Sequence, residues 1–174
     1  MENSVSTFNA GLRFGLFTGL ALIVFDLILY VADMKDPGDP NPVQHLAWVV
    51  LIIGIIMAIK YYKDNNEGSL SLGEAMGSGT IAAIIAALFS AAYIVLFMTV
   101  IDPSMVGELQ AVAKQQAMDQ NPNLTEEDYE QMAGLVNMFT SPTAIAIMSV
   151  IFYAVVGAIV SLIAGLFMKD KHAV

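Results

Sequence analysis

The chain has 174 residues, of which 57% are hydrophobic and 13% are charged, and its mean hydropathy is +0.68. This composition excludes an ordinary soluble domain and indicates an integral membrane protein. The absence of cysteine excludes disulfides, cysteine-ligated metals and a cysteine nucleophile, and the net charge of −9 opposes binding to nucleic acid.

The sequence contains four apolar segments that are long enough to cross a membrane. A helix of roughly 17–25 residues spans a hydrocarbon core of about 30 Å. The candidate spans are residues 8–31, 43–59, 76–101 and 142–168, of which the second is the shortest. They predict an all-α fold, a polytopic membrane four-helix bundle that forms a single domain over residues 1–174.

Basic residues are unevenly distributed between the two sides that these spans create. With both termini on one side, that side holds Arg13, Lys60, Lys63, Lys169 and Lys171. The opposite side then holds only Lys35 and Lys114. Because basic residues favour the cytoplasmic side of a membrane, we predict that both termini are cytoplasmic and that the acidic side is extracytoplasmic.

The first span combines a stripe of glycines with a lone carboxylate. Gly11, Gly15 and Gly19 recur at helical spacing. Asp26 lies about 20° from Gly15 and Gly19 around a helix, so the acid and the glycines share one face. We expect that face to contact protein rather than lipid. Asp26 would lie roughly 7.5 Å from the extracytoplasmic end of the helix.

Small residues recur at helical spacing in the other spans as well. They are Gly54 and Ala58 in the second, Gly79, Ala83 and Ala87 in the third, and Gly157, Ser161 and Gly165 in the fourth. In membranes, such residues let helices approach closely, where van der Waals contact drives association. The stripes predict a tightly packed bundle, or one that also self-associates.

The segment between the second and third spans carries a helix-start signal. Ser71 and Glu74 have the spacing of a capping box, in which each side chain accepts a hydrogen bond from the backbone N–H of the other residue. We interpret this segment as the start of the third helix, and a binding loop is the alternative.

Residues around this cap also carry a family resemblance. The second span ends in Gly54, Ala58, Lys60 and Tyr61, and it is followed by Gly68, Leu70, Ser71, Gly73, Glu74, Ala75 and Gly79. With the glycine-rich first span, this pattern resembles an uncharacterised family of small four-helix inner-membrane proteins common in Bacteroidota, over nearly the whole chain. The resemblance implies the fold and a location in the bacterial inner membrane. It implies no activity and no functional residue.

Residues 103–140 form an acidic insertion between the third and fourth spans. Asp102 and Pro103 predict the start of one helix, residues 121–123 break it, and Thr125 caps a second helix. We therefore predict an extracytoplasmic helical hairpin. Its apolar faces need cover from each other, from the membrane surface or from a partner, and we expect packing on the end of the bundle first and a protein partner second. Its acidity disfavours direct binding to anionic lipid.

The candidate site is a polar cluster of Asp26, Tyr93 and Tyr153 within the spans. Intramembrane carboxylates are costly and often belong to ion or proton pathways. The alternative is that Asp26 is protonated or hydrogen-bonded and only joins the helices. His45 and His172 fall on opposite sides of the predicted membrane, so they predict no shared metal site.

The sequence contains no motif for a catalytic triad, a zinc site or a nucleotide. We therefore predict a non-enzymatic protein without cofactor or bound metal. The favoured function is an assembly, scaffold or accessory subunit in the lipid bilayer, which binds a protein partner through residues 103–140 or forms a homo-oligomer. The alternative is a small oligomeric transporter or channel with an acidic outer vestibule, in which Asp26 titrates or contacts an ion.

Overall fold

The computed structural model describes residues 4–39 and 41–170, so the predictions for Lys171 and His172 lie outside the described residues. The elements are α1 (Thr7–Val31), a 3₁₀ turn (Pro42–His45), α2 (Leu46–Asp64), α3 (Leu72–Leu96), a π-helical turn (Phe97–Ile101), α4 (Ser104–Gln120), α5 (Glu126–Phe139) and α6 (Pro142–Met168). This part of the chain contains no strand, which confirms the all-α prediction. Four helical segments are long and apolar enough to cross a membrane: Thr7–Val31, Pro42–Asp64, Leu72–Ile101 and Pro142–Met168.

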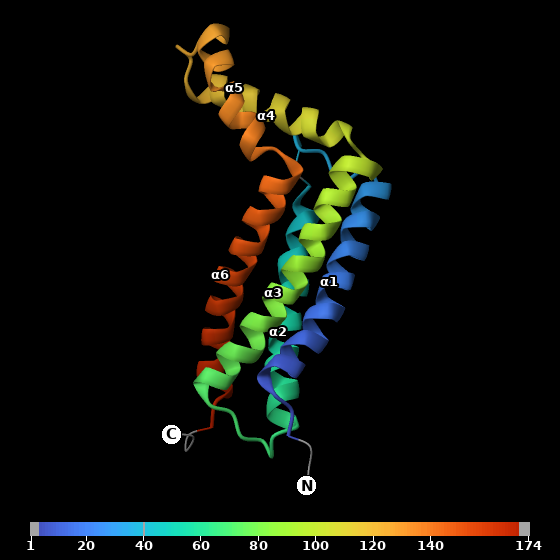
Figure 1. The fold of residues 1–174 in the computed structure, drawn as a ribbon, viewed down its shortest axis with the longest axis vertical. Coiled ribbons are helices and arrows are strands. Elements are labelled where there is room, and N and C mark those ends of the chain that lie inside the picture. Colours follow the sequence, from blue (N-terminus) through green and yellow to red (C-terminus); the bar gives the residue numbers. More distant parts are fainter. Residues whose placement is uncertain (1–3, 40, 171–174) are drawn as a thin grey trace.

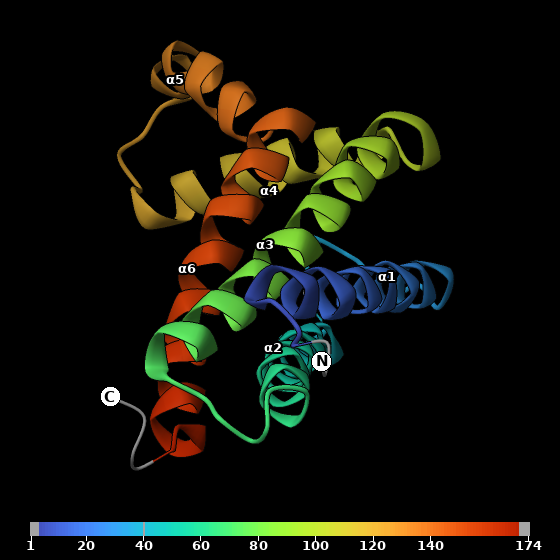
Figure 2. The ribbon, with the colours of Figure 1, turned by 60° about the horizontal axis from the view of Figure 1, so that its bottom comes forward.

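Three of the long helices, α1, α2 and α6, pack around the fourth, α3 (Figure 1). The first residues of α1 and the last residues of α6 lie at one end, which we call the terminal end, and α4 and α5 lie at the other, the hairpin end. In the view from below, α1 and α6 flank α3 on different sides (Figure 2). The central helix therefore contacts each of the other three, and α2 also contacts α1 and α6 directly.

Small residues make this packing close. A Cβ atom added to Gly15 would lie 2.6 Å from the Cβ of Ile85, and one added to Gly19 would lie 2.8 Å from the Cβ of Phe89. The remaining predicted packing positions behave alike: Gly11 faces Ile81, Gly54 faces Thr18, Gly79 faces Ser161, Gly157 faces Ala83, Gly165 faces Ala75, and Ala58 and Ala87 are buried. Each glycine stripe therefore lies at a contact between helices, and side chains of the neighbouring helix occupy the space that a Cβ atom would need.

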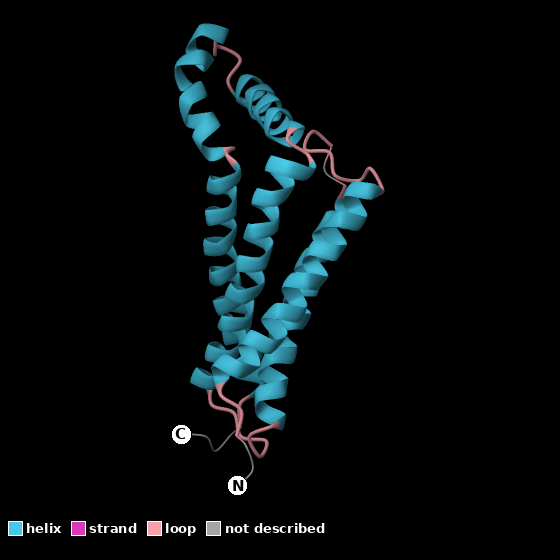
Figure 3. Ribbon diagram, turned by 45° about the vertical axis from the view of Figure 1, so that its right-hand side comes forward, coloured by secondary structure: helices cyan, strands magenta, loops and turns pink. Residues whose placement is uncertain are grey.

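The helices lie close together at the terminal end and diverge toward the hairpin end (Figure 3). One buried cluster, which includes Leu51, Ile55 and Ile59, joins α2 to the other helices. A second cluster contains Tyr93, Phe97, Met98 and Met105, and it connects the end of α3 to the start of α4. The divergence leaves space at the hairpin end that α4 and a loop have to cover.

A set of hydrogen bonds closes the terminal end. The Asp170 carboxylate accepts from the Lys63 ammonium at 2.8 Å and from the backbone N–H of Leu70 at 2.8 Å. The Lys63 ammonium also donates to the Met168 carbonyl at 2.7 Å. The hydrogen bonds from Lys63 and Leu70 hold the pKa of Asp170 below its ordinary value. These contacts tie the segment after α6 to α2 and to the loop before α3.

The start of α3 contains a complete capping box. The Ser71 hydroxyl accepts from the Glu74 N–H at 3.3 Å, and the Glu74 carboxylate accepts from the Ser71 N–H at 2.7 Å. The other oxygen of Glu74 accepts from the Tyr62 hydroxyl at 2.8 Å. Ser71 and Glu74 therefore lie at a helix start that is also joined to α2.

Several helix ends differ from the sequence prediction, and two of them show why. The second span is predicted to end at residue 59, but α2 continues to Asp64, because hydrophobicity marks the membrane segment and does not end a helix at its boundary. The second difference is at the start of the hairpin. Here α4 begins at Ser104 rather than at Pro103, and the Asp102 carboxylate accepts from the Ser104 N–H at 3.2 Å.

The two helices of the hairpin differ in how far they are covered. Met105 of α4 is buried against the end of α3, and α4 crosses the hairpin end of the molecule (Figure 1). In α5, Tyr129 is buried, but Met132, Leu135 and Phe139 are 47%, 59% and 56% exposed. The end of the molecule therefore buries Met105 at the start of α4 and leaves the rest of its apolar face half-buried, and the prediction of such cover is wrong for α5.

Candidate functional site

A cavity of about 370 Å³ lies at the hairpin end, where the long helices diverge. It is bounded by residues of all four long helices and of α4, by the loop that follows α1, and by the 3₁₀ and π-helical turns. Its lining is mainly apolar, and the polar side chains in it are Asp26, Lys35, Asp36, Gln44, Ser90, Tyr93 and Tyr153. A largely apolar cavity with a few convergent polar groups is the usual form of a small-molecule site.

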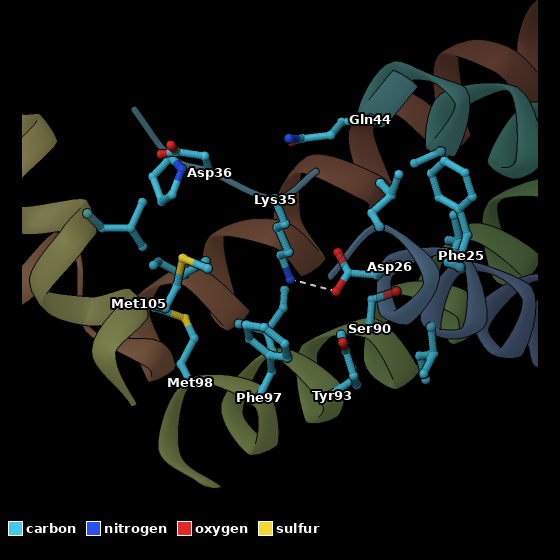
Figure 4. A pocket seen from close by; sticks show the side chains of 18 of the residues that line it. Phe25, Asp26, Lys35, Asp36, Gln44, Ser90, Tyr93, Phe97, Met98 and Met105 are labelled. Carbon is cyan, nitrogen blue, oxygen red and sulfur yellow. Dashed lines mark hydrogen bonds and ion pairs between the residues drawn. The ribbon is translucent and has the colours of Figure 1, made fainter. Parts of the chain in front are cut away.

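Asp26 is paired with Lys35 at this cavity. The Lys35 ammonium lies 2.6 Å from a carboxylate oxygen of Asp26 (Figure 4). The side chains of Lys35 and Asp26 are 24% and 32% exposed, so the pair is partly shielded from solvent. The ammonium also lies 3.7 Å from the centre of the Phe97 ring and 5.8 Å from that of Tyr93. A carboxylate and aromatic faces thus surround a single cation.

The loop after α1 turns the chain back so that Lys35 enters the cavity. Asp33 has a φ of 58°, a left-handed conformation that aspartate adopts more readily than most residues. Beyond Lys35, the Asp36 carboxylate accepts from the Gly38 N–H at 2.7 Å. The Gln44 side chain donates to the Met34 carbonyl at 3.0 Å and joins the loop to the start of α2. Lys35 is therefore directed by turn geometry and not by a helix.

Two hydroxyl groups at the cavity have no hydrogen-bond partner among the described residues. They are those of Ser90 and Tyr93, both on α3, whose side chains line the cavity. In Figure 4, the Tyr93 hydroxyl points toward the Asp26 carboxylate. Buried polar groups are nearly always hydrogen-bonded in folded proteins. Both hydroxyl oxygens therefore lie buried in the wall of the cavity with hydrogen-bonding capacity unused.

The structure brings the predicted cluster of Asp26, Tyr93 and Tyr153 to one cavity, from three different helices. Tyr153 also packs against Trp48, with ring centres 5.6 Å apart. Sequence reasoning missed Lys35 as the partner of Asp26. Its signal was that Lys35 is the only basic residue in the loop between the first two spans.

The described residues contain no cluster of three or more histidine, aspartate or glutamate side chains placed to hold a metal ion. The chemistry that the cavity offers is recognition: one ion pair, aromatic faces and hydroxyl groups in an apolar surround.

The four membrane-capable helices of the described residues, with a cavity at one end, are compatible with an integral membrane protein. The chain belongs to the family described as "Protein of unknown function (DUF4199)", which matches residues 13–170. This confirms the resemblance to an uncharacterised family over nearly the whole chain. No curated protein and no solved structure matches the chain.

Proposed function

We propose that this protein is a non-enzymatic integral protein of the bacterial inner membrane, with both termini in the cytoplasm, that acts as an assembly, scaffold or accessory subunit. In this proposal, the helical hairpin of residues 103–140 holds a protein partner on the extracytoplasmic side. The observation that carries it is the exposed apolar face of α5, formed by Met132, Leu135 and Phe139.

The charge of the hairpin favours a particular kind of partner. Next to the apolar face, α5 carries Glu126, Glu127, Asp128 and Glu130, and Lys114 on α4 pairs with Glu126 at 3.2 Å. An acidic helix is repelled by anionic lipid and by a second acidic hairpin. A partner with an apolar groove bordered by basic residues complements both features.

A site-specific photo-crosslinker tests this proposal. Placed at Leu135, it should yield one defined adduct that co-purifies at fixed stoichiometry in mild detergent and is lost when Met132→Asp and Phe139→Asp are added. The control position is Glu130, on the polar face of the same helix, which should give little adduct. Adducts with lipid alone, or only with another copy of this chain, would count against a protein partner.

The cavity favours a second candidate, a small oligomeric transporter or channel in which Asp26 contacts the cargo. The long helices are in close contact at the terminal end, so a path through the membrane would need a homo-oligomer. Asp26→Asn should then lower flux in proteoliposomes while the oligomer persists. Unchanged flux in that variant, or no flux in the wild type, would exclude this candidate.

A further inference from the structure

We propose that the cavity is a binding site for an organic ammonium ion with an apolar body, and that Lys35 occupies the ammonium position as a tethered substitute. This goes beyond the partner surface of the hairpin and does not depend on it. It names a ligand class for the cavity whether or not that ligand is transported.

The surroundings of the Lys35 ammonium are those of an amine-binding site. Asp26 supplies a carboxylate oxygen at 2.6 Å, and Phe97 and Tyr93 supply ring centres at 3.7 and 5.8 Å. The Phe97 ring is itself packed edge-on against Tyr30, with ring centres 4.9 Å apart, which fixes its face toward the cation. A carboxylate together with aromatic faces is the arrangement by which proteins recognise amines and ammonium ions.

Two hydroxyl groups without a hydrogen-bond partner also favour an ammonium ligand in the cavity. An alkylammonium carries three N–H donors, and within the described residues the hydrogen bond of the Lys35 ammonium goes to Asp26. Ser90 and Tyr93 are only 9% and 8% exposed, line the same cavity and have no partner in the described part of the chain. Both oxygens are buried in the cavity wall, so a ligand ammonium that is free of the loop would satisfy them once the Ser90 and Tyr93 side chains rotate toward it.

The space beside the Asp26–Lys35 ion pair can hold the apolar body of such a ligand. The cavity has a volume of about 370 Å³ and is lined mainly by apolar side chains such as Leu22, Met98 and Leu109. The Lys35 side chain enters from the loop and leaves this volume open. A ligand that places its ammonium at Asp26 can bury its hydrocarbon part there, which Lys35 does not do.

Charge distinguishes this ligand from its alternatives. The cavity lining holds two carboxylates, Asp26 and Asp36, against one ammonium, that of Lys35. An anionic ligand would have to take Lys35 from Asp26 and leave a partly buried carboxylate unpaired, which is costly. A neutral ligand gains nothing from the negative faces of the rings. An organic cation can take the position of the Lys35 ammonium, and Asp26 then still has a positively charged partner.

The tether also predicts that the wild type binds such ligands weakly. A group on a short linker competes at an effective concentration in the millimolar range. Removal of the Lys35 charge should therefore increase the affinity of the cavity for an organic ammonium ion.

The test uses full-length protein in nanodiscs, with hexylammonium as the probe and hexanol as its neutral match. Lys35→Met keeps an unbranched apolar side chain and should bind hexylammonium at least tenfold more tightly than the wild type, by calorimetry. Lys35→Arg, which keeps the charge, should show no gain, and Asp26→Asn combined with Lys35→Met should lose the gain. Equal affinity of Lys35→Met and the wild type for hexylammonium, or equal binding of hexanol and hexylammonium, would overturn the proposal.

A second measurement covers the case in which Lys35→Met does not fold, as judged by circular dichroism. In the wild type, hexylammonium at roughly tens of millimolar should shift the lysine side-chain NMR signal that Lys35→Arg removes. An unmoved signal at that concentration would overturn the proposal in the native protein.

Discussion

At the scale of single residues, the contact between Gly157 and Ala83 shows why small residues recur in the long helices. A Cβ atom added to Gly157 would overlap the Cβ of Ala83. Unlike a long side chain, the alanine Cβ has no rotamer by which to move aside, so α3 and α6 would have to separate. The close approach of these helices therefore depends on the absence of one methyl group.

Gly157→Ala should destabilise the folded protein by about 1–3 kcal/mol, the usual cost of overpacking. Thermal unfolding in one detergent measures the change. Gly77→Ala is the matched control, because its added Cβ meets Thr7 at an ordinary 3.5 Å, and alanine is favoured over glycine in a helix. Adding Ala83→Gly to Gly157→Ala should recover part of the loss. Equal stability of the Gly157 and Gly77 variants would contradict the contact.

Residue periodicity was enough to place the small residues at helix contacts and to place Asp26 on a protein-facing side of α1. It was not enough to find Lys35 as the partner of Asp26. That contact depends on a turn in which Asp33 has a φ of 58°, and the direction of a loop side chain follows no period. Ser90 was missed for a related reason, since a serine among alanines matches an ordinary packing stripe.

At the scale of elements, the terminal end depends on the segment that follows α6. Asp170 accepts hydrogen bonds from Lys63 of α2 and from the N–H of Leu70, and its own N–H donates to the Leu70 carbonyl at 3.1 Å. One side chain thereby connects three parts of the chain. Sequence analysis placed the helices but not this link, because it joins residues far apart in the chain.

This link should make stability depend on pH in the acid range. The pKa of Asp170 is lowered from its ordinary 3.8 by the hydrogen bonds from Lys63 and Leu70. The ionised carboxylate therefore stabilises the fold above pH 3.8, and this contribution is lost as the pH falls through the lower folded value. Asp170→Asn should lower the melting temperature at pH 7, and its difference from the wild type should shrink in acid.

The control for the acid series is Asp64→Asn, which changes an exposed acid at the end of α2. It should not reproduce the pH-dependent loss. A constant difference between Asp170→Asn and the wild type from pH 7 down to strongly acid solution would show that the carboxylate charge is not responsible.

At the scale of the whole molecule, the two ends of the helical body are built differently. Small residues, a capping box and the Asp170 contacts hold the terminal end together, whereas the hairpin end contains a cavity and an exposed helix face. The sequence predicted four spans and an insertion between the last two. It did not predict the divergence of the helices, because that depends on the angles at which the stripes pack.

The side of the membrane on which each end lies can be tested directly with single cysteines, because the sequence has none of its own. A cysteine at Asn123, in the exposed turn between α4 and α5, should react with a membrane-impermeant maleimide in cells whose inner membrane is intact. A cysteine at Ser69, an exposed loop residue at the terminal end, should react only after that membrane is opened. The reverse pattern would invert the proposed topology.

The π-helical turn at Phe97–Ile101 sets the direction in which the side chains of the next helix, α4, point. Because each helical residue turns the chain by about 100°, a gain or loss of one residue here would rotate α4 and carry Met105 away from the cavity. Met105 and Leu109 line the cavity, so the constraint covers the first two turns of α4. We therefore expect a different hairpin to cover the cavity only if it keeps these two positions and the five-residue length of the turn before it.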